Sequence, residues 1–300
     1  MYHTPVMLAE CIEGLNIRPN GTYLDLTFGG GGHSRAILER LGEGGKLIAF
    51  DQDEDARAEA EKIESPYFQF VETNFRYFRR YLRLYGIHQV DGILADLGVS
   101  SHQFDTANRG FSIRFDGVLD MRMNQQEGTT AAEIIQTYTE EKLQNLLYVY
   151  GEIHNSKLLA NALVRTRMKQ PITTIQALKE ICLQYAPYKK QNQYLAQIFQ
   201  ALRIEVNDEL KALEEMILQT PEAIAKGGRF VVLTYHSLED RLAKNFIQKG
   251  KFSGEIEKDL YGNYYVPFEA THRKTLTATE TELASNSRAR SAKLRVAERV

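Results

Sequence analysis

A glycine-rich segment near the N-terminus offers the clearest chemistry in this chain. Residues 23–34 read YLDLTFGGGGHS, and the apolar run 46–50 that follows ends at Asp51. Four successive glycines allow positive φ angles and a close approach of the backbone to a ligand, and a helix starting near His33 would direct its free N–H groups at that ligand. Asp51 lies 22 residues after Gly29, where nucleotide-binding α/β units place the carboxylate that binds ribose. The segment predicts a site for an adenosine-containing cofactor.

The residue types around this glycine loop favour S-adenosyl-L-methionine over a dinucleotide. A dinucleotide fold requires a third glycine in G-x-G-x-x-G, and Ser34 occupies that position here. Asp25, at the end of the expected first strand, would repel a pyrophosphate, but its charge suits a ligand that carries an ammonium and a sulfonium. We therefore expect S-adenosyl-L-methionine as the cofactor.

Two further polar segments follow apolar runs. Asp96 begins the segment DLGVSSHQ after the run 92–95, and residues 234–241, TYHSLEDR, follow the run 229–233. Because ligands bind at the carboxyl ends of strands in open α/β sheets, we expect Asp96 to lie beside the glycine loop and Asp51. The same residue types are also common as turn formers and helix caps, so both interpretations stay open.

Two other kinds of catalytic site find little support. None of Ser100, Ser101 and Ser237 lies in the G-x-S-x-G motif that is typical of serine hydrolases. The seven histidines are dispersed and show no recognised metal-ligand spacing, so we expect no metal. We expect three of them to act as hydrogen-bonding groups near a pocket: His33, His102 and His236.

Composition and charge set broader limits. The 300-residue chain is 43% hydrophobic and 25% charged, which is typical of a globular protein, and its formal net charge of −2 excludes a strongly basic nucleic-acid-binding protein. Cys11 and Cys182 are too few for a disulfide framework. The N-terminus lacks the pattern of a signal peptide, and no apolar run is long enough to span a bilayer. We expect a cytoplasmic protein.

Basic residues nevertheless gather in three places. Arginines recur over residues 76–83 and over 109–122, and five basic residues crowd residues 288–299 against the single acid Glu298. A solvated helix face explains most such clusters, but the C-terminal one favours contact with phosphate. Residues 286–291 indicate an ordered anion-binding turn.

The periodicity predicts an α/β fold with a helical insertion. Short apolar runs alternate with helical stretches, which indicates a parallel sheet covered on both faces. The expected strands are 22–26, 46–50, 67–71, 92–95 and 229–234. The expected helices after residue 105 are 130–138, 140–150, 155–168, 175–185, 194–205 and 209–218. We expect residues 1–105 and 206–300 to form one discontinuous domain, and residues 106–205 to form an inserted helical domain that recognises the substrate.

The chain resembles the RsmH (MraW) family of ribosomal RNA cytosine-N4 methyltransferases. The resemblance runs in order along nearly the whole sequence. It rests on the motifs HTPVML (3–8), TFGGGGHS (27–34), DLGVSS (96–101), RGFS (109–112), LDMRM (119–123), HSLEDR (236–241) and RARS (288–291).

This resemblance implies a Rossmann-like S-adenosylmethionine-dependent methyltransferase sheet with an inserted all-helical domain. It implies methylation of the N4 amino group of a specific cytidine in the decoding (P-site) region of 16S rRNA within the small ribosomal subunit. It also implies which positions bind the cofactor, from the methionine end to the adenine end. These are Gly31, Gly32, His33, Asp51, Phe75, Asp96 and Gln103.

The reaction itself suggests further roles. The cytosine amino nitrogen is a weak nucleophile, so catalysis depends on alignment and on hydrogen-bond acceptors at that nitrogen. Asp96 or a nearby backbone carbonyl is a candidate acceptor. An RNA base must also be unpaired or flipped and then stacked on an aromatic or arginine plane. The candidates for RNA contact are Phe111, Arg114, Tyr235, His236, Arg288 and Arg290.

Two alternatives remain. The chain could be an S-adenosylmethionine-dependent enzyme that acts on a protein amide or a small amine. It could instead be an RNA-binding module whose glycine loop is vestigial, although Asp51, Asp96 and the intact loop argue against this. Titration with the cofactor separates these classes, because the module would bind none.

Overall fold

The chain folds into two compact units. The structure, a computed structural model, describes residues 5–256, 258–262 and 264–300, so His3 and Thr4 of the first motif lie outside the described residues. The first unit comprises residues 1–98 and 210–300, and the second comprises residues 99–209. The insertion expected at 106–205 lies within the second unit.

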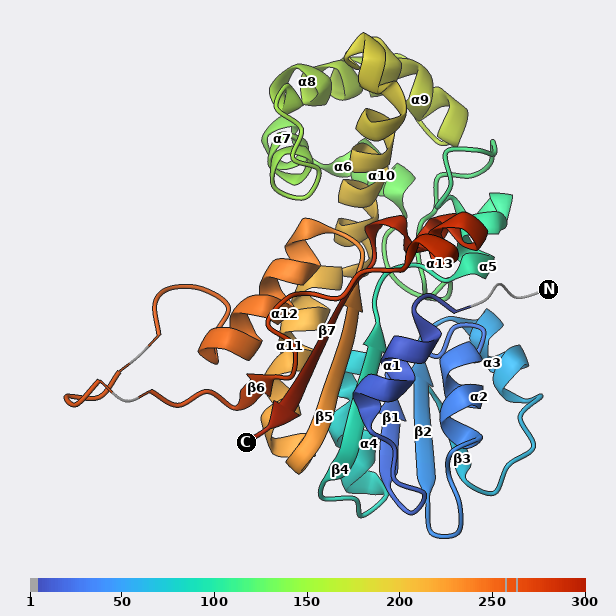
Figure 1. The fold of residues 1–300 in the computed structure, drawn as a ribbon. Coiled ribbons are helices and arrows are strands. Elements are labelled where there is room, and N and C mark those ends of the chain that lie inside the picture. Colours follow the sequence, from blue (N-terminus) through green and yellow to red (C-terminus); the bar gives the residue numbers. More distant parts are fainter. Residues whose placement is uncertain (1–4, 257, 263) are drawn as a thin grey trace. The chain divides into compact units, whose positions relative to one another are not determined.

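A seven-stranded mixed sheet forms the centre of the first unit (Figure 1). Its order is β3-β2-β1-β4-β5-β7-β6, and β7 runs antiparallel to both of its neighbours while the other pairs are parallel. The strands are β1 (Thr22–Asp25), β2 (Lys46–Asp51), β3 (Phe68–Glu72), β4 (Val90–Asp96), β5 (Ile224–Thr234), β6 (Phe268–Ala270) and β7 (Lys293–Arg299). The order of β1 to β5 matches that of a Rossmann fold, which brings the carboxyl ends of β1, β2 and β4 to one edge.

Helices cover both faces of this sheet, as the sequence predicts. They are α1 (Leu8–Leu15), α2 (Gly32–Leu38), α3 (Glu54–Ala60), α4 (Phe78–Leu84), α11 (Glu209–Ala223) and α12 (Ser237–Lys249). The short helix α13 (Glu280–Ser285) contacts the 3-10 helix Ser287–Ser291. Adjacent residues of β1 face opposite cores, because side chains alternate along a strand. Tyr23 packs with residues of α1 and α2. Leu24 packs with residues of α4, α11 and α12 on the other face.

The second unit is helical and has its own core. Its helices are α5 (Ser101–Asp105), α6 (Ala131–Thr137), α7 (Glu140–Val149), α8 (Ser156–Arg167), α9 (Ile175–Leu183) and α10 (Gln191–Asn207). Apolar residues of α6 to α10 make one cluster. Arg109 is 3% exposed and donates to the carbonyls of Arg122 and Met123, at 3.1 and 3.0 Å, so it stabilises the loop between α5 and α6.

The structure adds two features to the expected strands. Within the basic C-terminal cluster, residues 293–299 form β7, which pairs with both β5 and β6, and the anion-binding turn expected at residues 286–291 lies before this strand. The strand expected at 229–234 begins earlier, because β5 starts at Ile224: Val90 pairs with Ile224, Gly92 pairs with Arg229, and the register shifts between them. Gly227 has a φ of 76° there, so this bulge requires a residue that tolerates the left-handed region.

In the described part of the chain, none of the helices combines the length and the apolar character needed to cross a bilayer.

Asp240 of α12 pairs with two basic residues of β7, and the contribution of these pairs to stability can be tested. Its carboxylate accepts from Arg295 Nε at 2.8 Å and from Lys293 Nζ at 3.3 Å. Burial opposes ionisation, but these two cations outweigh it and lower the pKa of Asp240. The stabilisation is therefore present above the usual Asp value of 3.8 and is lost as the pH falls through the lowered pKa.

We expect Asp240→Asn to lower the free energy of unfolding by about 2 kcal/mol at pH 7, measured by urea titration. The difference from the wild type should shrink as the pH falls below 3.8. Glu255→Gln, at an exposed position, is the matched control and should change little. A difference that is independent of pH would contradict this account.

Candidate functional site

The glycine loop joins β1 to α2 and is held in one conformation. Gly29 and Gly31 have φ angles of 52° and 73°, and α2 begins at Gly32. A Cβ on Gly31 would lie 2.6 Å from Cζ of Phe28, so both the backbone angle and the packing require glycine. Arg35 Nη1 donates to the Gly30 carbonyl at 2.6 Å and closes the loop from the helix side.

Asp51, at the end of β2, bonds directly to this loop. Its Oδ2 accepts from the Gly29 N–H at 2.8 Å, and its Oδ1 accepts from the Asp53 N–H at 2.9 Å. Burial raises the pKa of Asp51 to about 6, against the lowering effect of these two hydrogen bonds. The residues that the sequence places 22 positions apart are therefore in contact.

Asp25 supports the loop and presents no surface to a ligand. It is 0% exposed, and its carboxylate accepts from Ser34 Oγ at 2.7 Å and from the Thr27 N–H at 3.2 Å. Burial raises the pKa of its carboxyl. Ser34, the residue that breaks the dinucleotide motif, is the side-chain donor that stabilises this carboxylate.

Asp96, at the end of β4, lies at the same edge. Its N–H donates to Thr27 Oγ1 at 2.6 Å, and its Oδ1 accepts from the Tyr235 hydroxyl at 2.7 Å. Burial raises the pKa of Asp96 to about 7, although the hydrogen bond from Tyr235 opposes this shift and the charge of Glu239 adds to it. Asp96 can therefore exchange a proton near neutral pH.

His33 lies between the N-terminal segment and Asp96. It is 6% exposed, its Nε2 is 3.2 Å from the Val6 carbonyl, and its Nδ1 is 3.7 Å from Asp96 Oδ2. Burial lowers the pKa of His33, with the charge of Asp25 opposing the shift. Because a carbonyl only accepts, Nε2 carries the hydrogen, and we infer that Nδ1 of the neutral ring is free to accept a proton.

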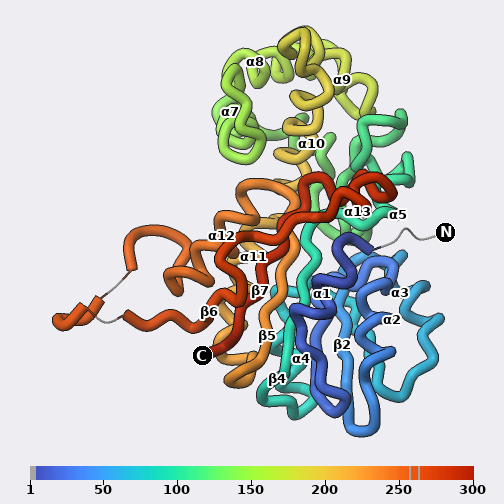
Figure 2. The backbone as a smooth tube through the Cα atoms, viewed as in Figure 1, coloured from blue at the N-terminus to red at the C-terminus, as the bar shows by residue number. Residues whose placement is uncertain are grey.

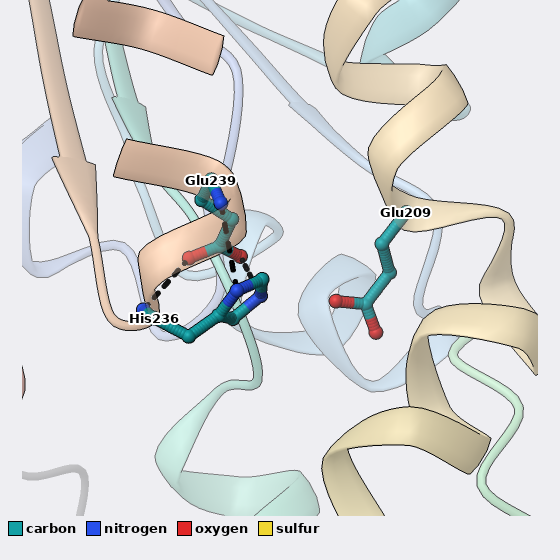
Figure 3. Close-up of side chains that lie close together, drawn as sticks. All are labelled: Glu209, His236 and Glu239. Carbon is teal, nitrogen blue, oxygen red and sulfur yellow. Dashed lines mark hydrogen bonds and ion pairs between the residues drawn. The ribbon is translucent and has the colours of Figure 1, made fainter. Parts of the chain in front are cut away.

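Tyr235 and His236 follow β5 and have partners within the first unit. The Glu239 carboxylate accepts from the N–H groups of Tyr235 at 2.9 Å and His236 at 3.4 Å, and His236 Nε2 lies 3.1 Å from its Oε1 (Figure 3). His236 also caps α12, because its Nδ1 accepts from the Glu239 N–H at 3.5 Å. Glu209, drawn in the same view, belongs to the helical unit, where it binds Arg203 at 2.8 and 2.9 Å.

Phe75 follows β3 and lies next to the strand that carries Asp51. Asp51 pairs with Glu72, and the Thr73 N–H donates to the Asp51 carbonyl at 2.7 Å. Asn74 then starts a short 3-10 helix, Phe75–Tyr77, by accepting from the Arg76 N–H at 3.0 Å. The partly buried ring of Phe75 packs against the core of the first unit.

Three of the other predicted residues fall in the helical unit and have structural partners there. Gln103 is 4% exposed and completes a capping box with Ser100 at the start of α5. Phe111 is 5% exposed and belongs to the helical core, so a base could stack on it only if the ring left that core. Arg114 binds Asp105 at 3.2 Å, and its guanidinium lies over the ring of Phe104 at 5.4 Å.

The residues of the C-terminal basic cluster divide between β7 and a short 3-10 helix. Arg295 and Lys293 bind Asp240, and Arg299 donates to the carbonyls of Pro221 and Pro267. The 3-10 helix Ser287–Ser291 carries half-buried Arg288 and exposed Arg290. Asn286 orders this turn by accepting from the Arg288 N–H at 3.3 Å.

The sequence analysis overlooked two features. Thr27 and Glu239 hold Asp96 and Tyr235 in place, but both occur within motifs where a cap or turn is the ordinary interpretation. In the helical unit, Tyr188 to Gln193 line an open hollow of about 280 Å³ formed by the 3-10 helix Tyr188–Lys190 and the first turn of α10. The sequence does mark this segment, because Tyr188 and the two lysines that follow it interrupt the helical pattern of apolar residues.

The raised pKa of Asp96 gives a test without cofactor or RNA. A carboxyl whose pKa rises from 3.8 to about 7 on folding stabilises the fold at low pH, and this contribution disappears as the pH rises through about 7. In Asp96→Asn the amide oxygen can still accept from Tyr235, but the titration is gone.

We therefore expect the free energy of unfolding of Asp96→Asn to increase relative to the wild type between pH 4 and 8, by at most about 4 kcal/mol. Urea titrations at several pH values measure this difference. Parallel pH profiles for the two proteins would show that Asp96 titrates normally.

Comparison with known proteins identifies the family of this chain. The model of the MraW methylase family matches residues 1–300. Proteins named ribosomal RNA small subunit methyltransferase H are 54% identical to this chain in Bacteroides thetaiotaomicron, over 99% of this chain and 97% of the relative, and in Cytophaga hutchinsonii, over 100% of both. A third, from Parabacteroides distasonis, is 54% identical over 100% of this chain and 98% of the relative. The chain belongs to the MraW methylase family.

Proposed function

We propose that this chain methylates the N4 amino group of a specific cytidine in the decoding (P-site) region of 16S rRNA, with S-adenosyl-L-methionine as the methyl donor. The relatives named above support ribosomal RNA of the small subunit as the substrate. Because that substrate is part of the ribosome, we place the reaction in the cytoplasm. The observation that carries the methyl-donor site is the bonding of the glycine loop to Asp51, beside Asp96 and His33.

The charges at this sheet edge fit the cofactor. Asp25, Asp51 and Asp96 accept hydrogen bonds from backbone N–H groups and hydroxyls, which are neutral donors. Such a group of carboxylates favours a ligand with an ammonium and a sulfonium and opposes a pyrophosphate. Gly31, Gly32 and His33 would hold the methionine portion, Asp51 the ribose and Phe75 the adenine side, with Asp96 completing the set in the first unit.

These positions support the following mechanism. S-adenosyl-L-methionine, when bound, supplies a methyl group on a positively charged sulfur. Transfer of that methyl group to cytosine N4 would form an N–C bond, break the C–S bond and leave a proton on N4 that must be removed. Asp96 is our candidate for accepting the hydrogen bond from N4 and this proton, because burial brings its pKa to about 7. Asp96 would act as the base only in its ionised form.

We assign RNA recognition to the helical unit, with its hollow at Tyr188–Gln193 as an RNA contact. Tyr188 is 88% exposed, so its ring is available to stack on an unpaired base. The lining residues include Lys189 and Lys190 and no carboxylate, which suits phosphate. Further candidates for RNA contact are Arg288, Arg290 and Arg114. The side chains of Tyr235 and His236 instead contact Asp96 and Glu239.

The decisive assay is methyl transfer from radiolabelled S-adenosyl-L-methionine to small ribosomal subunits that lack the modification. Nuclease digestion and mass spectrometry of the labelled nucleoside should identify N4-methylcytidine at one decoding-region site. Cofactor binding without labelling of RNA would move the target to another molecule. Absence of cofactor binding would refute the proposal.

The hollow gives a second prediction. We expect Lys189→Ala combined with Lys190→Ala to raise the KM for the ribosomal substrate about tenfold and to leave the affinity for S-adenosyl-L-methionine unchanged. Removal of two phosphate contacts should also reduce the salt dependence of RNA binding by about two units of the log–log slope. Lys157→Ala, at an exposed position in α8, is the control. An unchanged KM and slope would remove the hollow from the RNA-binding surface.

A further inference from the structure

The segment 5–7 lies against the glycine loop from outside the sheet. A Cβ on Gly32 would come within 2.2 Å of Pro5 Cγ, so the proline ring sits directly on the start of α2. The next residue, Val6, presents its carbonyl to His33 Nε2 at 3.2 Å. The segment therefore contacts two of the three residues assigned to the methionine end of the cofactor.

Met7 turns the chain away from this contact at a conformational cost. Its φ and ψ are 49° and 41°, in the left-handed region that disfavours a residue with a side chain, and α1 begins immediately after it. Met7 is also 1% exposed, so its amide needs a partner within the protein. An interaction from elsewhere must stabilise this turn.

Glu282 supplies that interaction from the far end of the sequence. Its Oε1 accepts from the Met7 N–H at 2.7 Å. Glu282 is in turn fixed at the start of α13, where Thr279 Oγ1 accepts from its N–H at 3.2 Å. Figure 2 shows α13, in red, near the start of α1, in blue, within the first unit. A carboxylate bonded to an amide N–H is one of the stronger hydrogen bonds in proteins.

The turn at Met7 decides how His33 is oriented. With the Val6 carbonyl in place, Nε2 must donate and Nδ1 points toward Asp96 Oδ2 at 3.7 Å. Without that carbonyl, the ring would lose its buried partner, and either tautomer or a flipped ring would become accessible. The geometry beside the proposed sulfonium site thus depends on a hydrogen bond made by Glu282.

We propose that Glu282 is a positioning residue for the methyl-donor site. By holding the Met7 amide, it keeps Pro5 and Val6 on the glycine loop and holds His33 with Nδ1 toward Asp96. This inference rests on the proposed function, because it takes the glycine loop as the binding site of S-adenosyl-L-methionine.

Four variants of the 300-residue chain separate the effect of side-chain length from the effect of charge. Glu282→Gln keeps an oxygen at the same distance but removes the charge, whereas Glu282→Asp keeps the charge but withdraws it from the Met7 amide. Glu282→Ala removes both, and Glu280→Ala changes an exposed residue of the same helix. Calorimetric titration with S-adenosyl-L-methionine gives the affinity, and methylation assays give KM and kcat.

We expect the Kd and the KM for S-adenosyl-L-methionine to rise about tenfold in Glu282→Ala and Glu282→Asp, with kcat changed less than threefold. Glu282→Gln and Glu280→Ala should stay within threefold of the wild type. In the wild type, ¹⁵N spectra of the labelled His33 ring should show a single tautomer with hydrogen on Nε2. Glu282→Asp should show a mixture, a readout that general destabilisation does not produce.

Three results would overturn the inference while leaving the proposed function intact. These are wild-type affinity in all four variants, equal losses in Glu282→Gln and Glu282→Ala, or an unchanged His33 spectrum in Glu282→Asp. If Glu282→Ala does not fold, as judged by circular dichroism, the contrast between Gln and Asp still decides the matter. A wild-type chain that binds no S-adenosyl-L-methionine would instead refute the proposed function, and this inference with it.

Discussion

The cost of burying carboxylates at the edge of the sheet governs the arrangement of this site. A buried carboxylate is stable only when its oxygens have hydrogen-bond donors. Asp51 obtains one from the Gly29 N–H, Asp25 obtains one from Ser34, and Asp96 obtains one from Tyr235. These requirements fix the bend of the glycine loop, the start of α2 and the chain that follows β5.

The kind of donor matters as much as the number. Each of these carboxylates is held by backbone N–H groups or hydroxyls, so the hydrogen bonds stabilise the negative charges without cancelling them. The pKa of Asp96 is consequently about 7 and that of Asp51 about 6, both raised by burial. A cationic ligand, such as the proposed methyl donor with its sulfonium, would complete the charge balance.

The first unit also depends on contacts between opposite ends of the chain. β7 inserts between β5 and β6, and Asp240 pairs with Arg295 of that strand. Glu282 reaches the Met7 amide across the same unit. Three C-terminal basic residues consequently stabilise the fold: Lys293, Arg295 and Arg299. Arg290, by contrast, is exposed.

Local pattern alone determined much of this protein. The first four expected strands and the helices of the insertion agree with the structure to within a few residues, because hydrophobic period and turn residues act over one or two turns of chain. The proximity of the glycine loop and Asp51 was likewise predictable, because the strand, the loop and the end of the next strand follow one another at a typical spacing.

Tertiary structure decided the rest: β7 pairs with β5, which is far away in sequence, and Phe111 enters a core. Tyr235 and Glu282 find partners 139 and 275 residues away. No local pattern encodes which distant donor meets which acceptor, because that choice is made only when the sheet brings the two ends of the chain together.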